Sequence, residues 1–399
     1  MPNPYGQAYA VAQSQMGLAI EATKGTAQAP VYWIPYRAPK YVPTRMFLPD
    51  ETLQGSMVSV YGLTPGMRYD SHGWDSYPYL DTFPILVAAE LGSSDTLTAA
   101  PGNTTLSSSA AAGATTIVTA ASIAANSFIT LGSASLGTLE SHYTTAVAGS
   151  YTITLATPLA FAHTSGAAVT GLTKHSFSLL NNSATVGNQP PSLTLTDFDG
   201  EEWRQLTAGQ MDKLSITGNA TALVNYTTDF YCNPSITPST PSPSYSTVTP
   251  VPSWTTGLVI SGTAYTDVEE WAVDMSRGTK PIPAVTGTLE YFEYFAGPLT
   301  VGGKTTVVET SGATELTQYQ NGTDNTFDFY VNDVTTGDIM RIHSSSVIYK
   351  TGELVRSKEY VEAELTFDFL PTATDAQAGG VSPIIIQFGN NVTTAYYTD

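Results

Sequence analysis

Apolar and polar residues alternate along the C-terminal part of the chain, and this pattern indicates β-strands. The segment 361–369, VEAELTFDF, places valine, alanine, leucine and two phenylalanines at every second position. Because successive side chains of a strand point to opposite faces, one face of this strand is expected in the core and the other in water.

The same alternation, bounded by turn-forming residues, predicts strands in much of the remaining chain. The predicted strands are Ser192–Thr196, Asp212–Asn219, Gly257–Ala264, Val268–Ser276, Thr286–Phe295, Thr326–Asn332 and Ile339–Tyr349. The 33 glycines and 25 prolines fit many short strands separated by turns. An all-β fold is therefore expected.

One short helix is predicted in the segment 79–92, YLDTFPILVAAELG. Asp81 is a candidate N-cap, Pro84 falls in the first turn, and Gly92 is a stop signal. We expect an amphipathic helix that covers a face or an edge of a sheet.

Residues 96–173 differ abruptly from their surroundings and are interpreted as an inserted small β domain. This range has no Lys or Arg, Glu140 is its only acidic residue, and Ala, Ser, Thr and Gly dominate. Five short strands are predicted within it, in ATTIVTA, NSFITLG, YTTAVA, YTITLATPL and AAVTGL, as in a small immunoglobulin-like sandwich. A low-complexity linker is the alternative. Residues 232–254, rich in Pro, Ser and Thr, are expected to form an extended loop or linker.

The charge balance argues against a protein that binds nucleic acid through its phosphates. The 399 residues contain 34 Asp and Glu but 15 Lys and Arg, which gives a formal net charge of −19. The single cysteine, Cys232, excludes an internal disulfide and is expected to be a small buried residue. Neither a signal peptide nor an apolar run of membrane-spanning length is recognised, so a soluble protein made without translocation is expected.

Motifs of catalysis and of metal binding fail when their spacing is tested. VGGKTT lacks the first glycine of a phosphate-binding loop and is interpreted as a hairpin turn. The five histidines show no zinc-site spacing and are interpreted as isolated, satisfied side chains. DFDGEE at 197–202 lacks the spacing of a calcium loop and is interpreted as a solvated turn. No enzyme activity, metal or cofactor is expected.

Carboxylates occupy alternate positions on two of the predicted strands. They are Glu362, Glu364 and Asp368 on one strand, and Glu270 and Asp274 on the other. Ordinary solvated strand surface is one interpretation. The other is a wall that stays negative, so that a passing polyanion finds no place to bind.

A basic and aromatic segment near the N-terminus contrasts with this acidic character. VYWIPYRAPKYVP contains Trp33, Tyr36, Arg37 and Lys40, and Arg45 follows, with no acidic residue between Val31 and Pro49. An exposed arm of this kind could dock on a neighbouring subunit. A strand and loop packed on their own domain are the alternative.

Six segments follow one another along the chain outside the insert: GLAIEATKGTAQAPVYWIPY, FLPDETLQGSMVSVYG, LDTFPILVAAELG, HSFSLLNN, VEEWAVDMSRGTKPIPAVTGTLEYFEYFAG and VEAELTFDFLPTATDAQ. Together they resemble the major tail tube proteins of long-tailed bacteriophages. The resemblance covers about 300 residues outside the insert. It rests on the order of the segments along the chain and on their residue patterns.

This resemblance implies a sandwich-like or barrel-like β domain, discontinuous over 1–95 and 174–399, with an N-terminal arm at 1–45. It implies hexameric rings that stack into a tube, the conduit through which the genome DNA passes into the host. The expected partners are copies of the chain and other tail proteins: the tape measure, the tail terminator and the tail tip. The expected location is the virion, after synthesis in the bacterial cytoplasm. The five carboxylates are then candidates for the channel lining, and Trp33, Tyr36, Arg37, Lys40 and Arg45 for contacts between subunits.

The insert departs from this family, although AAAGATTIVTAASIAANSFITLG and LATPLAFAHTSGAAV are similar to small β modules of other phage structural proteins. The channel and the stacking faces of a tube leave no room for an inserted domain, so the module is expected to face outward. There it is expected to contact a host surface weakly. A tail-tip or adhesin-type protein that binds host surface glycan is the alternative function. Its candidate stacking residues are Tyr69, Trp74, Tyr77 and Tyr79, for which packing in the core is the competing interpretation.

Overall fold

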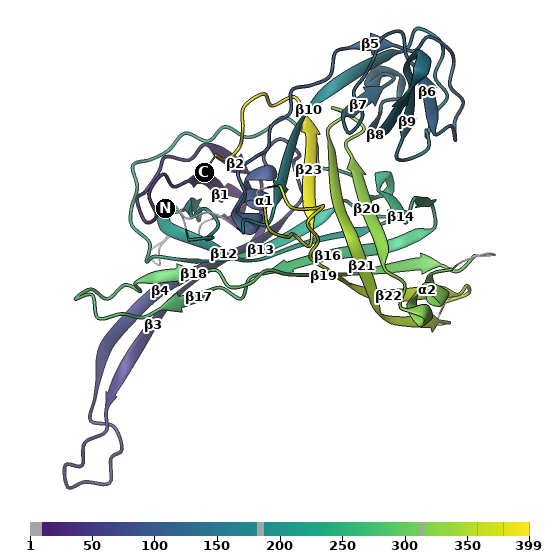
Figure 1. Ribbon diagram of the computed structural model, residues 1–399. Coiled ribbons are helices and arrows are strands. Elements are labelled where there is room, and N and C mark those ends of the chain that lie inside the picture. The colour runs from purple at the N-terminus through teal and green to yellow at the C-terminus, as the bar shows by residue number, and fades with distance from the viewer. Residues whose placement is uncertain (1–9, 182–186, 311–313, 357, 378, 399) are drawn as a thin grey trace, which may run out of the picture.

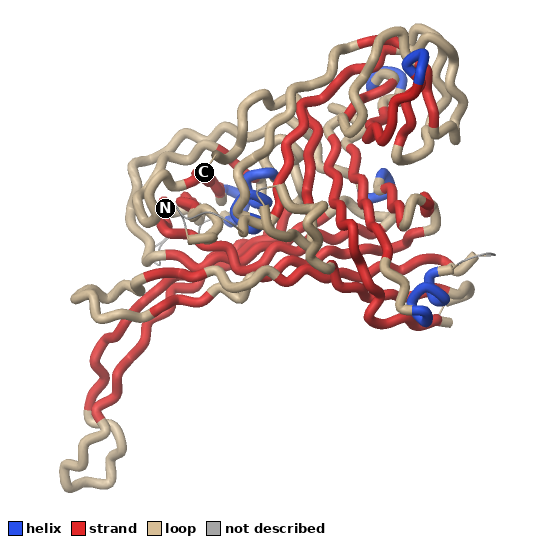
Figure 2. The backbone as a smooth tube through the Cα atoms, viewed as in Figure 1, coloured by secondary structure: helices blue, strands red, loops and turns tan. Residues whose placement is uncertain are grey.

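The computed structural model describes residues 10–181, 187–310, 314–356, 358–377 and 379–398. The regular secondary structure of the described chain consists almost entirely of antiparallel strands, which confirms the all-β class (Figure 1). It consists of a body, a small module at one end of the body, and a long hairpin that projects away from the body (Figure 2). No helix in the described ranges has the length and hydropathy needed to cross a membrane.

The body is organised around one wide antiparallel sheet, here called the main sheet. Its strands, in spatial order, are β3 (Arg37–Asp50), β4 (Gly62–Ser76), β13 (Asn225–Cys232), β12 (Trp203–Asn219), β16 (Val268–Ser276), β19 (Thr300–Val308), β22 (Glu362–Phe369) and β21 (Ile339–Val355).

Further strands extend this sheet and cover the face that lies toward the core. The first half of β21 pairs with β20 (Asn325–Asn332) and with β23 (Ile385–Asn390), and β20 leads on to β14 (Gly257–Ile260) and β15 (Thr263–Tyr265). A smaller sheet consists of β1 (Gln15–Ile20), β2 (Tyr32–Ile34), β11 (Leu193–Phe198) and the start of β12. The main core lies between these layers and includes Phe177, Tyr226, Phe327, Phe367 and Phe388.

Helix α1 (Pro84–Leu91) ends where the sequence predicts, but its N-cap and its environment differ from the prediction. Pro84 occupies the first turn, and Gly92 ends the helix with a φ of 88°, a left-handed conformation that glycine adopts without strain. All eight residues are buried, because β10 and β12 pack against the helix within the core. The predicted amphipathic character is therefore wrong. Asp81 is not the N-cap; its carboxylate instead accepts a hydrogen bond of 2.5 Å from Ser246.

Most predicted strands are present, and three predictions need correction. The predicted strand Gly257–Ala264 is a hairpin, β14–β15, broken at Ser261 and Gly262. Of Thr286–Phe295, only Glu293–Phe295 (β18) is a strand, paired with β17 (Lys280–Ile282). VGGKTT lies inside β19 and is not a hairpin turn. A second helix, α2 (Glu315–Asn321), was not predicted. The short 3-10 turns are Val11–Gln13, Ala134–Leu136, Gly149–Tyr151 and Ser253–Thr255.

The inserted segment forms a β module with its own core, as predicted. It contains β5 (Thr104–Thr105), β6 (Thr116–Val118), β7 (Phe128–Leu131), β8 (Glu140–Ala148), β9 (Thr152–Leu155) and the start of β10 (Ala168–Ser178). Strand β8 pairs first with β7 and then with β9, so it belongs to two small sheets. Apolar side chains from both sheets, such as Ile117, Ile129 and Ile153, form the core of the module.

Strand β10 runs from the module into the body and pairs with strands of both. Its first half pairs with β5 and β7 in the module, and its second half pairs with β23 in the body. The backbones of Thr98 and Lys174 bridge at the base of the module, with N to O distances of 2.8 and 2.9 Å. Across the junction, Phe128 and Tyr143 of the module pack in one cluster with Tyr330 and Ile339 of the body.

The two segments predicted as an arm and a linker are mostly attached to the body. Of the predicted arm at 1–45, residues 1–9 lie outside the described residues, while β1 and β2 are strands of the smaller sheet. Residues 232–254 form an extended strap rather than a free linker. The strap makes single β-bridges from Ile236 to Gln205, from Tyr245 to Trp33 and from Pro252 to Leu223.

Candidate assembly surfaces

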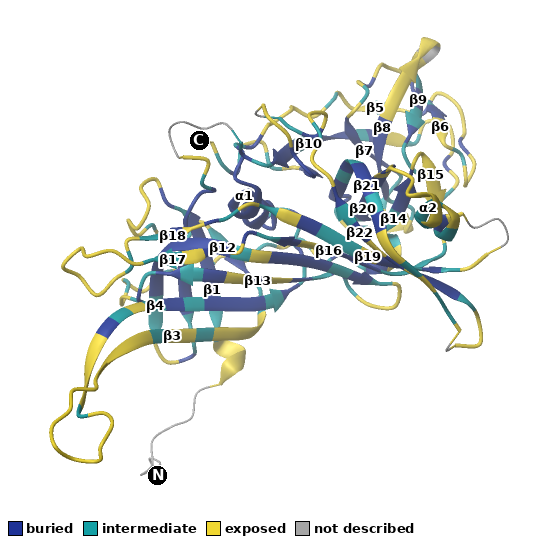
Figure 3. Cartoon of the chain, turned by 60° about the horizontal axis from the view of Figure 1, so that its bottom comes forward, coloured by how far each residue is buried: buried dark blue, intermediate teal, exposed yellow. Residues whose placement is uncertain are grey.

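One face of the main sheet is buried and the other, here called the polar face, carries the predicted carboxylates. On the buried side, Ile216, Val273, Gly303 and Phe367 stand opposite one another on neighbouring strands. The residues before and after them in each strand point to the polar face. Figure 3 shows buried positions alternating with less buried ones along these strands.

The strand register brings the predicted carboxylates into two rows on the polar face. The first row, across β12, β16, β19, β22 and β21, is Asn219, Glu270, Thr306, Glu364 and Glu353. The second row, across β13, β12, β16, β19 and β22, is Thr227, Ser215, Asp274, Gly302 and Asp368. Because directly opposed residues share a face, the two predicted strands present their carboxylates together.

Lysines stand among these carboxylates, so the polar face is acidic but not uniformly so. Lys304 lies between the two rows, opposite Ala272 and Thr366, with its Nζ 4.0 Å from Oε2 of Glu270. Lys350 approaches Asp368 with an Nζ to Oδ2 distance of 2.8 Å. Both pairs are substantially exposed, and such pairs contribute about 0–1 kcal/mol each. Asp274 and Glu364 are exposed and have no ion pair among the described residues.

Glu362 differs from the other four predicted carboxylates because it does not reach the surface. Its side chain is 3% exposed, and Nζ of Lys358 lies 2.6 Å from its Oε1. Lys358 also binds Glu269 at 2.6 Å, and these hydrogen bonds raise the pKa of the lysine. The lysine therefore covers Glu362, and this carboxylate is not part of the exposed acidic surface.

The main sheet ends in two strands with unpaired edges. In the described part of the chain, β3 pairs only with β4, and residues 348–355 of β21 pair only with β22. Unpaired N–H and C=O groups of this kind are templates for pairing with another chain.

The hairpin β3–β4 projects beyond the body. Residues 70–76 of β4 pair with β13, but the part from Thr44 to Tyr69, here called the hairpin tip, extends past that strand (Figures 1 and 3). Beside it lies the β17–β18 loop, where the N–H of Arg68 donates to the C=O of Leu289 at 2.8 Å.

Large apolar side chains are exposed on the hairpin tip and on the adjacent loop. On the strands these are Met46, Phe47, Leu48 and Leu63; in the turn between them, Leu53, Met57, Val58 and Val60; and in the β17–β18 loop, Val285, Leu289 and Phe292. A two-stranded ribbon is marginally stable alone, and a large exposed apolar patch marks an interaction surface. The tip is therefore suited to packing against another molecule.

The five predicted arm residues fall into two groups. Trp33 is buried in β2, with its ring in edge contact with Trp203 and Tyr245, and the Tyr36 hydroxyl donates to Asp197 at 2.8 Å. Both residues thus pack on their own body, which was the alternative interpretation.

Of the basic residues, Arg37 lies at the start of β3, where it pairs with Asp75 at 2.9 Å and stacks on Tyr77. Lys40 and Arg45 are exposed further along the strand. The apolar residues of the hairpin tip were missed, because a short run of apolar residues in a strand normally indicates burial.

The aromatic cluster considered for glycan stacking does not form one exposed platform. Trp74 is buried and stacks on Phe230 with ring centroids 5.4 Å apart, and Tyr69 packs against Tyr231 and Tyr291. Packing within the protein, the competing interpretation, holds for these two residues.

Each of the five histidines lies beside a carboxylate, so none is isolated. Four are hydrogen-bonded to that carboxylate, but neither ring nitrogen of His72 has a hydrogen-bond partner among the described residues. The pairs are His72 with Asp197, His142 and His163 with Glu140, His175 with Asp95, and His343 with Asp328. In the described ranges, no group of three or more His, Cys, Asp or Glu side chains could hold a metal ion.

Two further predictions about single sites are confirmed. Cys232 is free and fully buried, and burial raises the pKa of its thiol. DFDGEE forms a turn in which Asp199 accepts the N–H groups of Glu201 and Glu202 at 2.9 and 3.0 Å and pairs with Arg204.

The acidic face, the open sheet edges and the exposed apolar hairpin are thus surfaces of one chain that suit association with other molecules. When the sequence is compared with known proteins, it matches no protein-family model and no curated protein.

Proposed function

We propose that this chain is a structural protein that assembles with copies of itself into the tail tube of a long-tailed bacteriophage. The observation that carries the proposal is the polar face: an acidic sheet surface backed by the core and bounded on both sides by unpaired strand edges. In the proposed tube this face lines the channel.

An acidic lining suits a channel that DNA must cross without binding. Proteins bind DNA chiefly by neutralising phosphates with Lys and Arg, and that attraction is weak on a surface where carboxylates outnumber the lysines. Screening limits electrostatic repulsion to about 8 Å at physiological salt, so only carboxylates close to the DNA act on it. Glu270, Asp274, Glu364 and Asp368 are the proposed lining residues.

The open edges give a route to ring closure. If β3 of one copy lies beside the second half of β21 of the next copy, the main sheets continue into one another around the ring. Closed symmetry then removes every free edge and prevents the unlimited aggregation that such edges favour. Six copies per ring is the number that the resemblance to tail tube proteins implies.

In the proposed tube, the hairpin tip of each subunit contacts another subunit beyond its own body. Its exposed apolar side chains gain stability only when another molecule covers them, at about 25 cal/mol per Å² of apolar surface. We assign them to a neighbouring copy in the tube. The module lies across the body from the main sheet (Figure 1), which supports its proposed outward position.

Electron microscopy of the purified chain tests the proposal when combined with a hairpin variant. The wild type should form hollow tubes or hexameric rings. Leu48→Asp with Leu63→Asp should leave folded, unassembled subunits, because both side chains are more than half exposed. The matched control is Leu136→Asp, at an exposed leucine of the module, which should still assemble.

Three results would count against the proposal. A wild type that stays monomeric at high concentration contradicts self-assembly. Isolated trimers that bind glycan favour the adhesin-type alternative. Tubes that form equally well with both hairpin leucines replaced contradict the role of the hairpin tip.

A further inference from the structure

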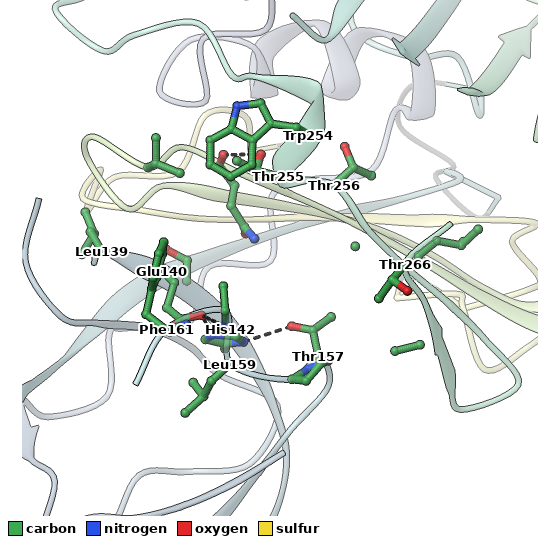
Figure 4. A pocket seen from close by; sticks show the side chains of 18 of the residues that line it. Leu139, Glu140, His142, Thr157, Leu159, Phe161, Trp254, Thr255, Thr256 and Thr266 are labelled. Carbon is green, nitrogen blue, oxygen red and sulfur yellow. Dashed lines mark hydrogen bonds and ion pairs between the residues drawn. The ribbon is translucent and has the colours of Figure 1, made fainter. Parts of the chain in front are cut away.

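A cleft separates the module from the body, and both parts contribute its walls. The cavity measures about 390 Å³, which falls in the range of small-molecule sites, and such sites are often found between domains. Figure 4 shows Trp254 of the body on one wall, with Leu139, His142 and Phe161 of the module on the opposite wall.

Trp254 is the most unusual residue of this cleft, because its side chain is large and yet 64% exposed. It lies in the 3-10 turn Ser253–Thr255, which is firmly attached to the body. The Thr255 hydroxyl lies 2.7 Å from the C=O of Pro252 and 2.8 Å from that of Asn332, and the N–H of Ser253 donates to Ala222. The backbone that carries Trp254 is therefore anchored at the mouth of the cleft.

The opposite wall is also fixed. Nδ1 of His142 lies 3.0 Å from Oγ1 of Thr157, and its Nε2 lies 2.9 Å from Glu140 (Figure 4). Gly257 allows close approach of the two parts, because a Cβ there would lie 3.1 Å from Cγ2 of Thr157. Ser141 donates to the C=O of Gly337 in the body at 2.5 Å. These contacts set the width of the cleft.

The two carboxylates in the lining are already engaged by protein groups. Glu140 accepts from His142, from His163 at 2.6 Å, and from the N–H groups of Ala160 and Phe161. Burial would raise its pKa, but these hydrogen bonds outweigh burial and lower it. Asp333 lies within hydrogen-bond distance of Thr249 and Thr336 and of the N–H of Thr335. No Lys or Arg is among the lining residues, so the cleft has no lysine or arginine side chain that could pair with an anion.

The remaining lining combines apolar surface with hydroxyl groups. Leu139, Leu159 and Phe161 are apolar, whereas Thr157, Thr256 and Thr266 carry hydroxyls. Thr256 lines the cleft, and its hydroxyl is buried and has no hydrogen-bond partner among the described residues.

We propose that this cleft binds a neutral saccharide, with the Trp254 ring stacked on the apolar face of one sugar unit. An uncharged pyranose presents C–H groups on its faces and hydroxyls around its rim, and this matches an indole platform edged by threonines. The inference does not depend on tube formation, because all the residues that line the cleft belong to one chain.

Saturation-transfer NMR of the full-length chain tests the inference, with maltose, cellobiose, lactose and chitobiose as neutral probes and sialyllactose as the anionic probe. At least one neutral probe should bind at millimolar concentration, and sialyllactose should bind no better than lactose. Trp254→Ala should weaken binding about tenfold and Trp254→Phe less, because Phe keeps an aromatic face. Thr256→Val keeps the side-chain shape and should weaken binding about fivefold, the effect of one lost hydrogen bond.

The matched control is Tyr151→Ala, at an exposed aromatic residue of the module outside the cleft. It should bind as the wild type does, and near-UV circular dichroism shows whether each variant is folded. The inference is overturned if no neutral probe binds the wild type, or if folded Trp254→Ala binds as tightly as the wild type. Absence of probe binding together with burial of Trp254 on assembly would make the cleft a subunit contact instead.

Discussion

Glu270 of β16 and Glu364 of β22 lie on either side of the same residue, Thr306 of β19, with their side chains on one face of the main sheet. Two strands that are far apart in the sequence thus place their carboxylates in one row. Asp274 and Asp368 repeat the relationship on either side of Gly302. The acidic character of the polar face is therefore a property of the sheet register.

Charge reversal on this row should make the channel retain DNA. Glu270→Lys with Glu364→Lys should still form tubes, since both side chains lie on the solvent face, but DNA should bind and be released by salt. The control is Glu201→Lys with Glu359→Lys, at exposed positions that belong to neither row. Binding is measured by DNA retention on assembled tubes over a salt series. Equal retention by both double variants would show that the polar face is not the channel lining.

Assembly should also depend on two arginines of the hairpin tip. Arg45 and Arg68 are exposed and stand directly opposite each other across β3 and β4, an arrangement that is unfavourable within one chain. A carboxylate of a neighbouring copy would relieve the repulsion. Arg45→Glu with Arg68→Glu should therefore abolish assembly, whereas Arg45→Ala alone should weaken it and reduce its salt sensitivity. Sedimentation velocity over a salt series measures this, and unchanged assembly of the double variant would contradict it.

Glu90 should make the body less stable as the pH rises. Burial within α1 raises its pKa from 4.5 to about 7, and its carboxylate oxygens have no hydrogen-bond partner among the described residues. The protonated form is favoured in the folded state, so this contribution to stability is complete below the unfolded pKa and is lost as the pH rises through the folded pKa.

Glu90→Gln removes this titration. Relative to the wild type, its free energy of unfolding should increase by about 3 kcal/mol between pH 4.5 and 8. Chemical denaturation at both pH values measures the difference. The adjacent Arg277 donates to the C=O groups of Glu90 and Leu91 at 2.7 and 3.0 Å, contacts that Gln leaves in place. A constant difference between the two proteins across this range would contradict the prediction.

Removal of the module should leave the body able to assemble. Because Thr98 and Lys174 are bridged, an Asn-Gly turn can replace residues 99–173 without moving the strands that enter the body. The variant loses Phe128 and Tyr143 from the junction cluster, so a lower thermal midpoint is expected. Tubes should still be visible by electron microscopy, with less density at their outer surface. A folded variant that forms no tubes would make the module a structural part of the ring.

Local patterns in the sequence predict strands well where one face is buried and the other solvated. Val268–Ser276 is a strand with the predicted bounds, and the alternation places Glu270, Asp274, Glu364 and Asp368 correctly on one face. Glu362 follows the same alternation but is covered by Lys358, four residues earlier in the chain. Alternation along a strand does not predict this contact, because Lys358 precedes the strand.

Features that depend on the assembled fold were predicted less well. Helix α1 has apolar residues almost all round, as a fully buried helix does, and the amphipathic interpretation overlooked this pattern. The apolar residues of the hairpin tip resemble core residues in sequence, although the chain leaves them uncovered. The cleft was not predicted, because its walls come from residues 139–161, 254–266 and 332–334, which only the fold brings together.

A cryo-electron microscopy map of the assembled protein tests the central claim most directly, because it locates the polar face relative to the channel. We predict a hollow tube with Asp274 and Glu364 facing the lumen and the module on the outer surface. A map in which these carboxylates face outward or lie buried between subunits, or a preparation without any tube, would contradict the account.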